Sequence, residues 1–560
     1  MLRFKLIGVS YQNAAVHQNE DVDFLLEEDR WNDFGYCTTY HLHAGKRLTQ
    51  GGTSYLGSIS IMHHGQKDNC EYGIVGLNTF DASYFSSLSS EHVSLTGSID
   101  LCLAVNKYLP QIDQRREFIQ ALRLITSTDD ALYQEFKSED CFQKSFLRSR
   151  TIEDVPLEQI RSYLFGEEVY YELMKCPVRF TLPNHESFEI NYTRQDGTNS
   201  NLPSEIIAFI GDNGAGKSSI LYRVVKLLYS DYTFRDRYTT LRVEPSNIGI
   251  NRLLMFSYST FDNFTLPGVC KSDYARILSE WRDNRGRFVF CGIRDVEREY
   301  QQLSEGENRR EICEFDQHEE EIPLKKLKQL AEEFVDNAIQ LARVSSERNA
   351  DWLMMWDEIQ KRLPLFSENC TWVPKSELGW NETQTKEKLF TQYLNCSTGI
   401  KFFLHCVTML LSKIEKGSVI LFDEPENHLQ PPLLSVLLHI IRTFARKYDS
   451  AVMVATHSPV VIQETYARNV FIVSRDGDDI HVNNPRFETY GESFGFINNL
   501  VFKLSSDFAD YSKAIRQTYI NEGCKDRNID NIVELIEGKL GVQLSSQMMA
   551  YVIQLKEEGV

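Results

Sequence analysis

Runs of apolar residues and stretches of strict alternation divide the chain into segments that predict strands and helices. In the first third, 4–9 and 56–61 follow strand patterns, whereas 112–125 follows a helical pattern with apolar residues among arginines. The mixture predicts an N-terminal α+β extension over residues 1–170. The next segment, 171–228, contains a hairpin pattern at 178–193, then a wholly apolar run and an amphipathic helix.

Residues 229–384 form a long insertion, after which the strand-and-helix pattern returns. Within it, 322–365 has helical periodicity, but no heptad persists over four repeats, so a short helical bundle is expected rather than a long coiled coil. The acidic stretch 305–321 is interpreted as a solvated loop. Residues 385–485 resume the α/β pattern, and 486–560 are expected to form a helical tail. The chain as a whole is therefore assigned to the α/β class.

The composition of the chain excludes several classes of protein. With 560 residues and 42% hydrophobic content, the chain can form several packed cores, which excludes wholesale disorder. The formal net charge of −19 argues against a surface built for general nucleic-acid binding. The twelve cysteines include no CxxC pair, which indicates reduced thiols, and no apolar run reaches the length of a membrane span. We therefore expect a cytoplasmic protein without membrane contact.

A glycine-rich loop joins the apolar run 206–210 to the helix that follows it, and this is the context that a phosphate-binding loop needs. Glycines let successive N–H groups turn toward phosphate oxygens, and the helix N-terminus adds partial positive charge. Lys217 is expected to reach the β- and γ-phosphates of ATP, and the Ser218 hydroxyl is expected to bind Mg²⁺. The nucleotide-binding candidates of this loop are Gly211, Asp212, Asn213, Gly214, Ala215, Gly216, Lys217, Ser218 and Ser219.

The run 418–423 predicts a second buried strand, and it ends in two carboxylates. Apolar residues at successive positions indicate burial on both faces, as in a parallel sheet, and ligands bind at the carboxyl ends of such strands. Asp423 is expected to hold Mg²⁺, and Glu424 is expected to activate the attacking water as general base. A further apolar strand, 451–456, ends at His457. This histidine would lie beside the γ-phosphate if the two strands are parallel neighbours.

A second helix start with small residues precedes these strands. Ser397 is expected to be the N-cap of an apolar helix, and Gly399 exposes backbone N–H groups near its start. Taken alone, this feature is only a helix cap. In the company of the phosphate-binding loop, it is a second candidate anion-binding helix start.

In this order and at these spacings, the four elements resemble the ATP-binding cassette (ABC) superfamily. The segments 423–429, reading Asp-Glu-Pro-Glu-Asn-His-Leu, and 456–459, reading Thr-His-Ser-Pro, resemble its SMC-like, AAA_21-type branch. The resemblance implies a P-loop head with an antiparallel β subdomain, and two such heads that enclose two ATP molecules. It also implies that Ser397 and Gly399 contact the partner's γ-phosphate in trans, and that the loop at 427–428 crosses the dimer interface.

Two places depart from the pattern of that superfamily. Cys396 and Ile400 stand where its signature usually has Leu and Gln or Glu, so sensing in trans is expected to be weaker or to depend on another partner. No clear glutamine loop follows the first half of the head. The segment 256–262 takes its place, with Ser259 or Asp262 as the substitute.

Three weaker segments, 257–262, 288–294 and 489–492, resemble the PtuA family, the ATPase subunits of the Septu and retron-associated antiphage defence systems. The phosphate-binding loop, Asp423, Glu424 and His457 together predict slow ATP hydrolysis, and the ABC resemblance implies a homodimer or higher homo-oligomer. The PtuA resemblance implies an HNH nuclease partner (PtuB-like) that the ATPase regulates. A retron reverse transcriptase with its RNA–DNA would be a further partner.

Two other functions stay open on the sequence alone. A nuclease site of the chain's own would lie in the N-terminal region, where the pairs His41/His43 and His63/His64 are candidate metal ligands, although surface histidines are the default interpretation. An SMC-like DNA-repair ATPase is the other alternative. A basic cluster at 282–298 is a separate candidate for nucleic-acid contact, although pairing with neighbouring acids is favoured there. The acidic net charge and the missing coiled coil count against the repair ATPase. The lack of clustered carboxylates counts against the nuclease. The basic cluster consists of Arg282, Arg285, Arg287, Arg294 and Arg298.

Overall fold

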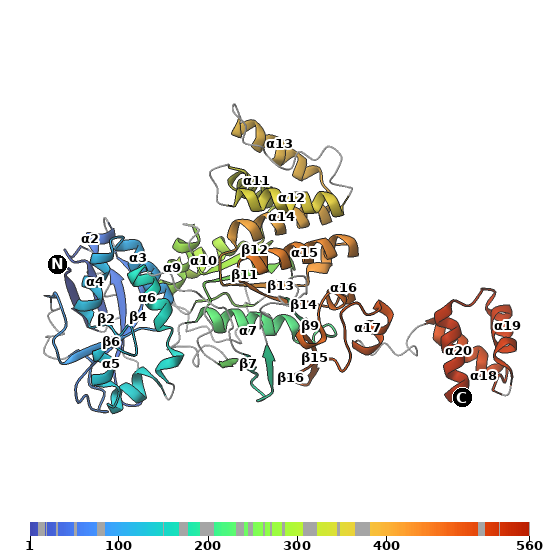
Figure 1. The fold of residues 1–560 in the computed structure, drawn as a ribbon, viewed down its shortest axis with the longest axis horizontal. Helices are drawn as coiled ribbons and strands as arrows, with labels where there is room; N and C mark the ends of the chain where they lie inside the picture. Colours follow the sequence, from blue (N-terminus) through green and yellow to red (C-terminus); the bar gives the residue numbers. More distant parts are fainter. Residues whose placement is uncertain are drawn as a thin grey trace.

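The computed structural model contains an N-terminal sheet with helices, a larger central sheet beneath a layer of helices, and a C-terminal helical bundle (Figure 1). The candidates Asp262 and Arg285 and the acidic stretch 306–321 lie outside the residues that it describes. The structure describes residues 1–8, 17, 19–29, 32–49, 53–74, 84–148, 151–166, 177–190, 206–230, 240–244, 250–260, 264–268, 271–282, 286–305, 322–343, 348–363, 381–501, 510–525 and 527–558.

The N-terminal sheet has six strands, β1 Phe4–Ile7, β2 Phe24–Glu28, β3 Thr39–Ala44, β4 Ser54–His63, β5 Tyr84–Phe85 and β6 His92–Leu95. Their order is β5-β1-β2-β3-β4-β6, and only β1 and β2 are parallel. The helices of this unit are α2 Lys46–Thr49, α3 Ile99–Tyr108, α4 Ile112–Leu122, α5 Ala131–Phe136 and α6 Leu157–Phe165. Helix α4 ends earlier than the expected 112–125, because Arg123 adopts a left-handed φ of 49° at its C-cap.

The central sheet has seven strands, β9 Ile206–Ile210, β11 Arg252–Ser257, β12 Phe288–Gly292, β13 Ser418–Asp423, β14 Ala451–Thr456, β15 Val470–Asp476 and β16 Asp479–Asn483. Their order is β12-β11-β13-β14-β9-β15-β16, and all neighbours are parallel except β15 and β16. Alternate residues of β9 serve two cores: Ile206, Ala208 and Ile210 face one, and Ile207 and Phe209 face the other. This double burial explains why every position of the strand is apolar.

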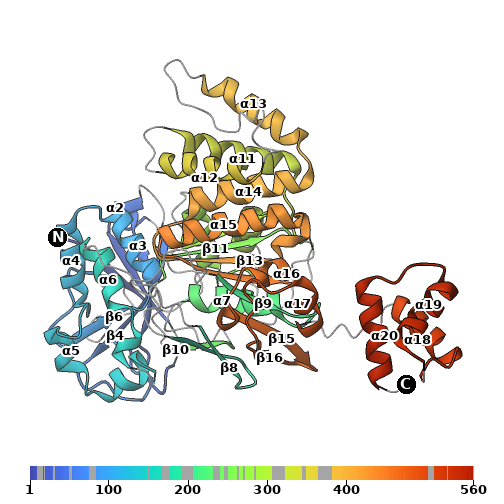
Figure 2. The same cartoon turned by 45° about the vertical axis from the view of Figure 1, so that its right-hand side comes forward.

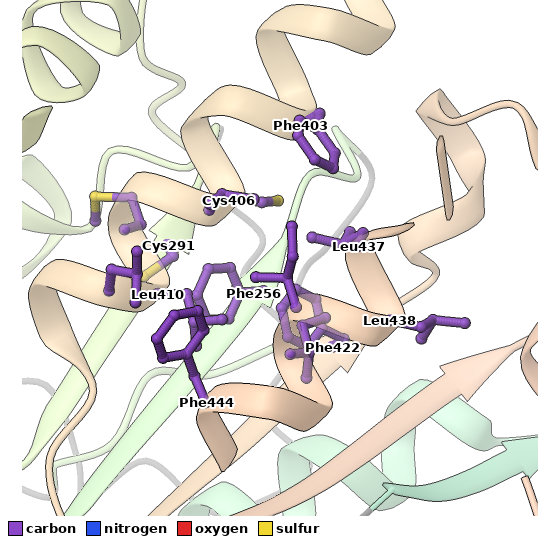
Figure 3. Packing of buried hydrophobic residues seen from close by; sticks show 14 of the residues in the cluster. Phe256, Cys291, Phe403, Cys406, Leu410, Phe422, Leu437, Leu438 and Phe444 are labelled. Atoms are coloured by element: carbon purple, nitrogen blue, oxygen red, sulfur yellow. The ribbon is translucent and has the colours of Figure 1, made fainter. Parts of the chain in front are cut away.

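Helices cover both faces of the central sheet, and together they form the unit called the head below (Figure 2). One face carries α7 Lys217–Tyr229, α9 Lys271–Arg282 and α10 Val296–Glu305, beside a small antiparallel sheet of β7 Val178–Thr181, β8 Ser187–Ile190 and β10 Arg242–Glu244. The other face carries α14 Thr398–Lys413 and α15 Pro431–Lys447, with α11 Leu327–Ala342, α12 Asn349–Arg362 and α13 Glu382–Asn395 further out. Phe256 and Phe422 stack at 4.3 Å beneath α14 and α15 (Figure 3).

The expected helical segment 322–365 contains two helices, α11 and α12. Phe334 and Ile339 are buried against α14, as their helical spacing suggests. Leu324 and Leu327 are instead exposed, because Leu324 precedes the helix and pairs with Arg294 in an isolated β-bridge. The apolar face of α11 therefore begins one to two turns after the point at which the sequence pattern starts.

A buried polar chain ties α11 to α14 and to the end of β11. Tyr258 lies 2.6 Å from Nδ1 of His405 on α14, and Nε2 of His405 lies 3.1 Å from Oε2 of Glu333 on α11. Lys325 lies 2.7 Å from the other oxygen of Glu333. Burial alone would raise the pKa of Glu333, but Lys325 and His405 outweigh it and lower this pKa to about 2.

Glu333→Gln is expected to destabilise the protein by about 3 kcal/mol at pH 7, because the buried Lys325 and His405 lose their anionic partner. A carboxylate with a lowered pKa stabilises the fold above its unfolded pKa of 4.5, and this contribution is lost as the pH falls toward 2. The difference from wild type should therefore be constant between pH 6 and 8 and shrink below about pH 4.5. Urea unfolding at several pH values measures it. Glu332→Gln, at an exposed neighbouring position, is the control and should cost less than about 0.5 kcal/mol.

A buried charge cluster joins the N-terminal unit to the head. Asp100 on α3 lies 3.4 Å from Arg276 of α9 and 3.4 Å from Arg287, which precedes β12. Arg294 is likewise buried, and both its Nε and Nη2 donate to Glu299. Two members of the candidate basic cluster thus serve internal ion pairs and are not available to a nucleic acid.

Helix α16 Pro459–Gln463 belongs to the head, and the tail contains α17 Phe494–Val501, α18 Asp510–Asn521, α19 Ile529–Leu540 and α20 Ser546–Glu558. Ile497 of α17 is buried in the core of the head, whereas Phe494 and Phe496 are exposed. Helices α18 to α20 share a separate core that includes Ile515 and Ile532. The tail is thus divided between one helix that belongs to the head and a bundle with its own interior.

Candidate functional site: a phosphate-binding loop facing two carboxylates and a histidine

The glycine-rich loop connects β9 to α7 and adopts a conformation that depends on its glycines. Gly214 and Gly216 have φ values of 80° and 103°, in the left-handed region that side chains disfavour. A Cβ at Gly211 would overlap the carbonyl of Val473 on β15. Ala215 is packed in the core, whereas Asp212, Asn213 and Ser219 are exposed. The loop is thus anchored at its ends and open along one side.

Lys217 begins α7 and lies beneath this loop, with only 4% of its surface exposed. Its ammonium group donates to the carbonyls of Gly211 and Asp212, each at 3.0 Å. Burial lowers the pKa of Lys217, while Glu424 and Asp423 oppose that shift. Lys217 is therefore a buried cation whose hydrogen-bond acceptors are carbonyls of its own loop.

The Ser218 hydroxyl meets Asp423 across the gap between α7 and the end of β13. Ser218 Oγ donates to Asp423 Oδ1 at 2.8 Å, and the phenol of Tyr222 donates to Oδ2 at 2.7 Å. Tyr222 also stacks on Phe264 at 3.6 Å between ring centroids. The sequence reasoning missed Tyr222. Its spacing of four residues from Ser218 on one helix face is the signal that could have identified it.

Glu424 follows directly after β13 and has a strained backbone. Its φ of 46° and ψ of 60° are left-handed, which is costly for a residue with a side chain. Its N–H donates to the carbonyl of Ala455 on β14, and its Oε2 accepts from the side chain of Asn427 at 2.8 Å. The turn thereby holds the carboxylate beyond the end of the sheet, next to Asp423.

His457 lies at the end of β14, which is the parallel neighbour of β13, with Asp423 opposite Ala455. Its Nδ1 is 3.8 Å from Glu424 Oε1 and 3.2 Å from Glu426 Oε1. Strand β14 also pairs with β9 on its other side. The ends of β9, β13 and β14 therefore bring the loop, the two carboxylates and the histidine to one edge of the sheet.

Ser397 is the N-cap residue of α14, but its side chain makes no capping hydrogen bond and is exposed. Gly399 in the first turn packs against the chain at residue 428, where a Cβ would come within 2.8 Å of the His428 carbonyl. Asn427 and His428 are exposed as well. These residues form an exposed face beside the turn that carries Glu424.

The donor set of the site fits Mg²⁺ and the phosphates of a nucleotide. A hydroxyl and a carboxylate 2.8 Å apart, Ser218 and Asp423, are the hard oxygen ligands that Mg²⁺ takes. A Cβ built at Gly214 would meet nothing within 4 Å, so the loop has open space on that side. The two acceptors of Lys217 are carbonyls of its own loop, and phosphate oxygens could replace them.

The comparison with family models finds the AAA_21 family over residues 326–463, described as an AAA domain and associated with the AbiEii toxin of a type IV toxin–antitoxin system. The matched segment contains Ser397, Asp423, Glu424 and His457, and the loop 211–218 precedes it. Residues 326–463 are therefore similar to an AAA-type ATPase domain. Such a domain implies nucleotide binding and, in general, ATP hydrolysis.

Among curated proteins, this chain is similar to Protein ea59 of Escherichia phage lambda. The two are 25% identical over 582 residues, which span 100% of this chain and 99% of the phage protein. The likeness therefore extends well beyond the ATPase domain, into the N-terminal unit and the tail.

Two solved structures also align, each with a TM-score of 0.25, which is too low to support an argument. One is described as a metal-chelate type ABC transporter in an inward-facing conformation, 10% identical, with 55% of this chain and 83% of that chain covered. The other is Stu0660 of Streptococcus thermophilus, 12% identical, with 68% and 93% covered.

The remaining candidates from the sequence lie outside this site. His43 is buried and lies 3.1 Å from Glu27, and His64 lies between Glu135 and Glu139. Within the described ranges, no three His, Cys, Asp or Glu side chains form a group suited to a metal ion. Of the helices that the structure describes, none is long and apolar enough to cross a membrane.

Proposed function

We propose that this protein is an ABC-type ATPase switch that binds ATP with Mg²⁺ and hydrolyses ATP slowly. The observation that carries the proposal is the 2.8 Å contact between Ser218 and Asp423, with Glu424 next in the chain and His457 beside it. In this assignment, Lys217 binds the β- and γ-phosphates, and Ser218 and Asp423 hold Mg²⁺, which would neutralise phosphate charge.

Glu424 accepts a proton from the attacking water, and His457 orients the γ-phosphate end of the site. Two features support Glu424 as the base. Its strained backbone holds the carboxylate beyond the sheet, and Asn427 fixes one of its oxygens, which leaves the other beside His457. Asp423 is already engaged by Ser218 and Tyr222, so it is the poorer base.

We further propose that two heads close around two ATP molecules. The support is the face formed by the exposed Ser397, Asn427 and His428 with the partly exposed Gly399. The Ser397 hydroxyl makes no capping hydrogen bond within its own helix. Each face would complete the partner's loop site, so the assembly would be a homodimer or a higher homo-oligomer with two-fold related sites.

Head closure would regulate a separate effector, which we propose to be an HNH nuclease, with a retron reverse transcriptase as an additional partner in some systems.

The motif resemblance favours antiphage defence as the setting, and a full-length relative encoded by a phage fits a role in phage–host conflict. The proposed place of action is the cytoplasm, where ATP is available. Metal-dependent cleavage of DNA by the purified chain alone would contradict this division of labour.

A subunit-mixing experiment tests the composite site. Lys217→Ala and Ser397→Arg should each abolish ATP hydrolysis, since each variant inactivates both sites of a homodimer. A mixed dimer retains one intact loop opposite one intact Ser397, so an equimolar mixture should recover about one quarter of wild-type activity. Light scattering of Glu424→Gln with ATP should show a dimer. No recovery on mixing, together with a monomer under those conditions, would refute the head dimer.

A further inference from the structure

Glu426 lies two residues beyond the proposed base, and its carboxylate collects several donors from the next strand. It belongs to a short 3-10 helix, Pro425–His428, and its side chain is 8% exposed. Its Oε1 accepts from the Thr456 hydroxyl at 2.7 Å and from the His457 N–H at 2.6 Å. The same oxygen is 3.2 Å from His457 Nδ1.

These contacts extend into the turn that follows β14. The Thr456 hydroxyl, which donates to Glu426, accepts from the N–H of Ser458 at 2.9 Å. The Ser458 hydroxyl in turn accepts from the N–H of Val460 and caps α16. One carboxylate oxygen therefore anchors a chain of hydrogen bonds that sets the backbone on both sides of His457.

The second oxygen, Oε2, is buried and has no hydrogen-bond partner among the described atoms. A buried carboxylate oxygen without a hydrogen-bond partner lowers the stability of the fold, which indicates that a glutamate at this position has a role other than stabilisation. His457 Nδ1 is likewise buried and makes no hydrogen bond among the described atoms, so Glu426 tethers the backbone of His457 rather than its ring. The imidazole is 42% exposed, and this exposed part of the ring is free to meet a ligand.

We propose that Glu426 is a positioning residue that holds His457 in the orientation needed for catalysis. The length of its side chain, which lets an oxygen accept hydrogen bonds from the turn, matters for this role, and its charge does not. The proposal rests on the ATPase function assigned above. Glu426 makes no recorded hydrogen bond to the Mg²⁺ or phosphate candidates Ser218, Asp423 and Lys217, and its charge is one of several carboxylate charges that oppose the lowering of the Lys217 pKa. Its effect on the reaction would pass through His457.

Two conservative variants separate the effect of side-chain length from the effect of charge at position 426. Glu426→Gln keeps the length and an acceptor oxygen but loses the charge, whereas Glu426→Asp keeps the charge but is one methylene shorter. We expect Gln to keep kcat within about threefold of wild type, and Asp to lower kcat by about 10- to 100-fold with little change in KM for ATP. The reverse order, with Asp active and Gln impaired, would overturn the proposal.

A second readout does not need ATP. Diethyl pyrocarbonate modifies accessible imidazoles, and trypsin releases residues 448–468 as a peptide whose only histidine is His457. Loss of the tether in Glu426→Asp and Glu426→Ala should speed modification of His457 at least about threefold, and Glu426→Gln should match wild type. Glu488→Ala is the control, because Glu488 also accepts backbone N–H groups but contacts a different turn. It should leave the rate unchanged.

The two readouts distinguish failure of this inference from failure of the proposed function. If wild type hydrolyses no ATP but the modification rates follow the expected order, the tether is real and the ATPase assignment is wrong. If wild type is an ATPase and the modification rate of His457 is the same in all four proteins, Glu426 does not hold the histidine.

Discussion

Glu424→Gln is expected to lower kcat for ATP hydrolysis by about 10²- to 10⁴-fold while ATP still binds. The amide is isosteric with the carboxylate and keeps an oxygen to accept the Asn427 hydrogen bond, but it cannot take a proton from water. Lys217, Ser218 and Asp423 are untouched, so the affinity for ATP should change by less than about threefold. Single-turnover hydrolysis and equilibrium binding of a fluorescent ATP analogue measure the two quantities separately.

Glu488→Gln serves as the control for this variant, because its carboxylate contacts only the turn at 467–490 in the recorded hydrogen bonds. It should hydrolyse ATP at the wild-type rate. Hydrolysis by Glu424→Gln at the wild-type rate would show that the base is another group. A loss of binding equal to the loss of hydrolysis would show that Glu424 acts on the nucleotide itself.

Lys217→Ala is expected to weaken ATP binding by about 10²- to 10⁴-fold, since the charged group that we assign to the β- and γ-phosphates is lost. Without nucleotide, loss of the Lys217 hydrogen bonds to the Gly211 and Asp212 carbonyls and removal of a buried charge have opposite effects on stability, so the melting temperature should change little. Isothermal titration with ATP and Mg²⁺, next to thermal unfolding without them, measures both effects.

The matched control is Lys226→Ala on the same helix. Lys226 is also buried but lies nine residues later, at about 14 Å along the helix axis, so its loss should spare ATP binding. Wild-type affinity in Lys217→Ala would remove the phosphate-binding assignment of the loop. Unfolding of Lys217→Ala without nucleotide would instead give this lysine a structural role.

Local sequence patterns were sufficient for the elements that carry the site. The strand Ile206–Ile210, the glycine-rich loop and the helix that starts at Lys217 are contiguous, and backbone preferences of apolar runs and glycines act over that range. The strands ending at Asp423 and Thr456 were equally clear, because burial on both faces leaves only apolar residues in them. Leu324 shows the limit of the pattern, since a β-bridge to Arg294 overrides the helical periodicity there.

By itself, the sequence determined the α/β class, the loop and the order of its chemical groups along the chain. Only the tertiary structure decided that β14 lies between β13 and β9, that Tyr222 binds Asp423, and that Glu426 holds the turn of His457. It also decided that Arg287 and Arg294 form internal ion pairs, with Asp100 and Glu299 respectively. The physical reason is that periodicity reports whether a face is buried, whereas the partner that buries it is chosen by contacts between residues far apart in the chain.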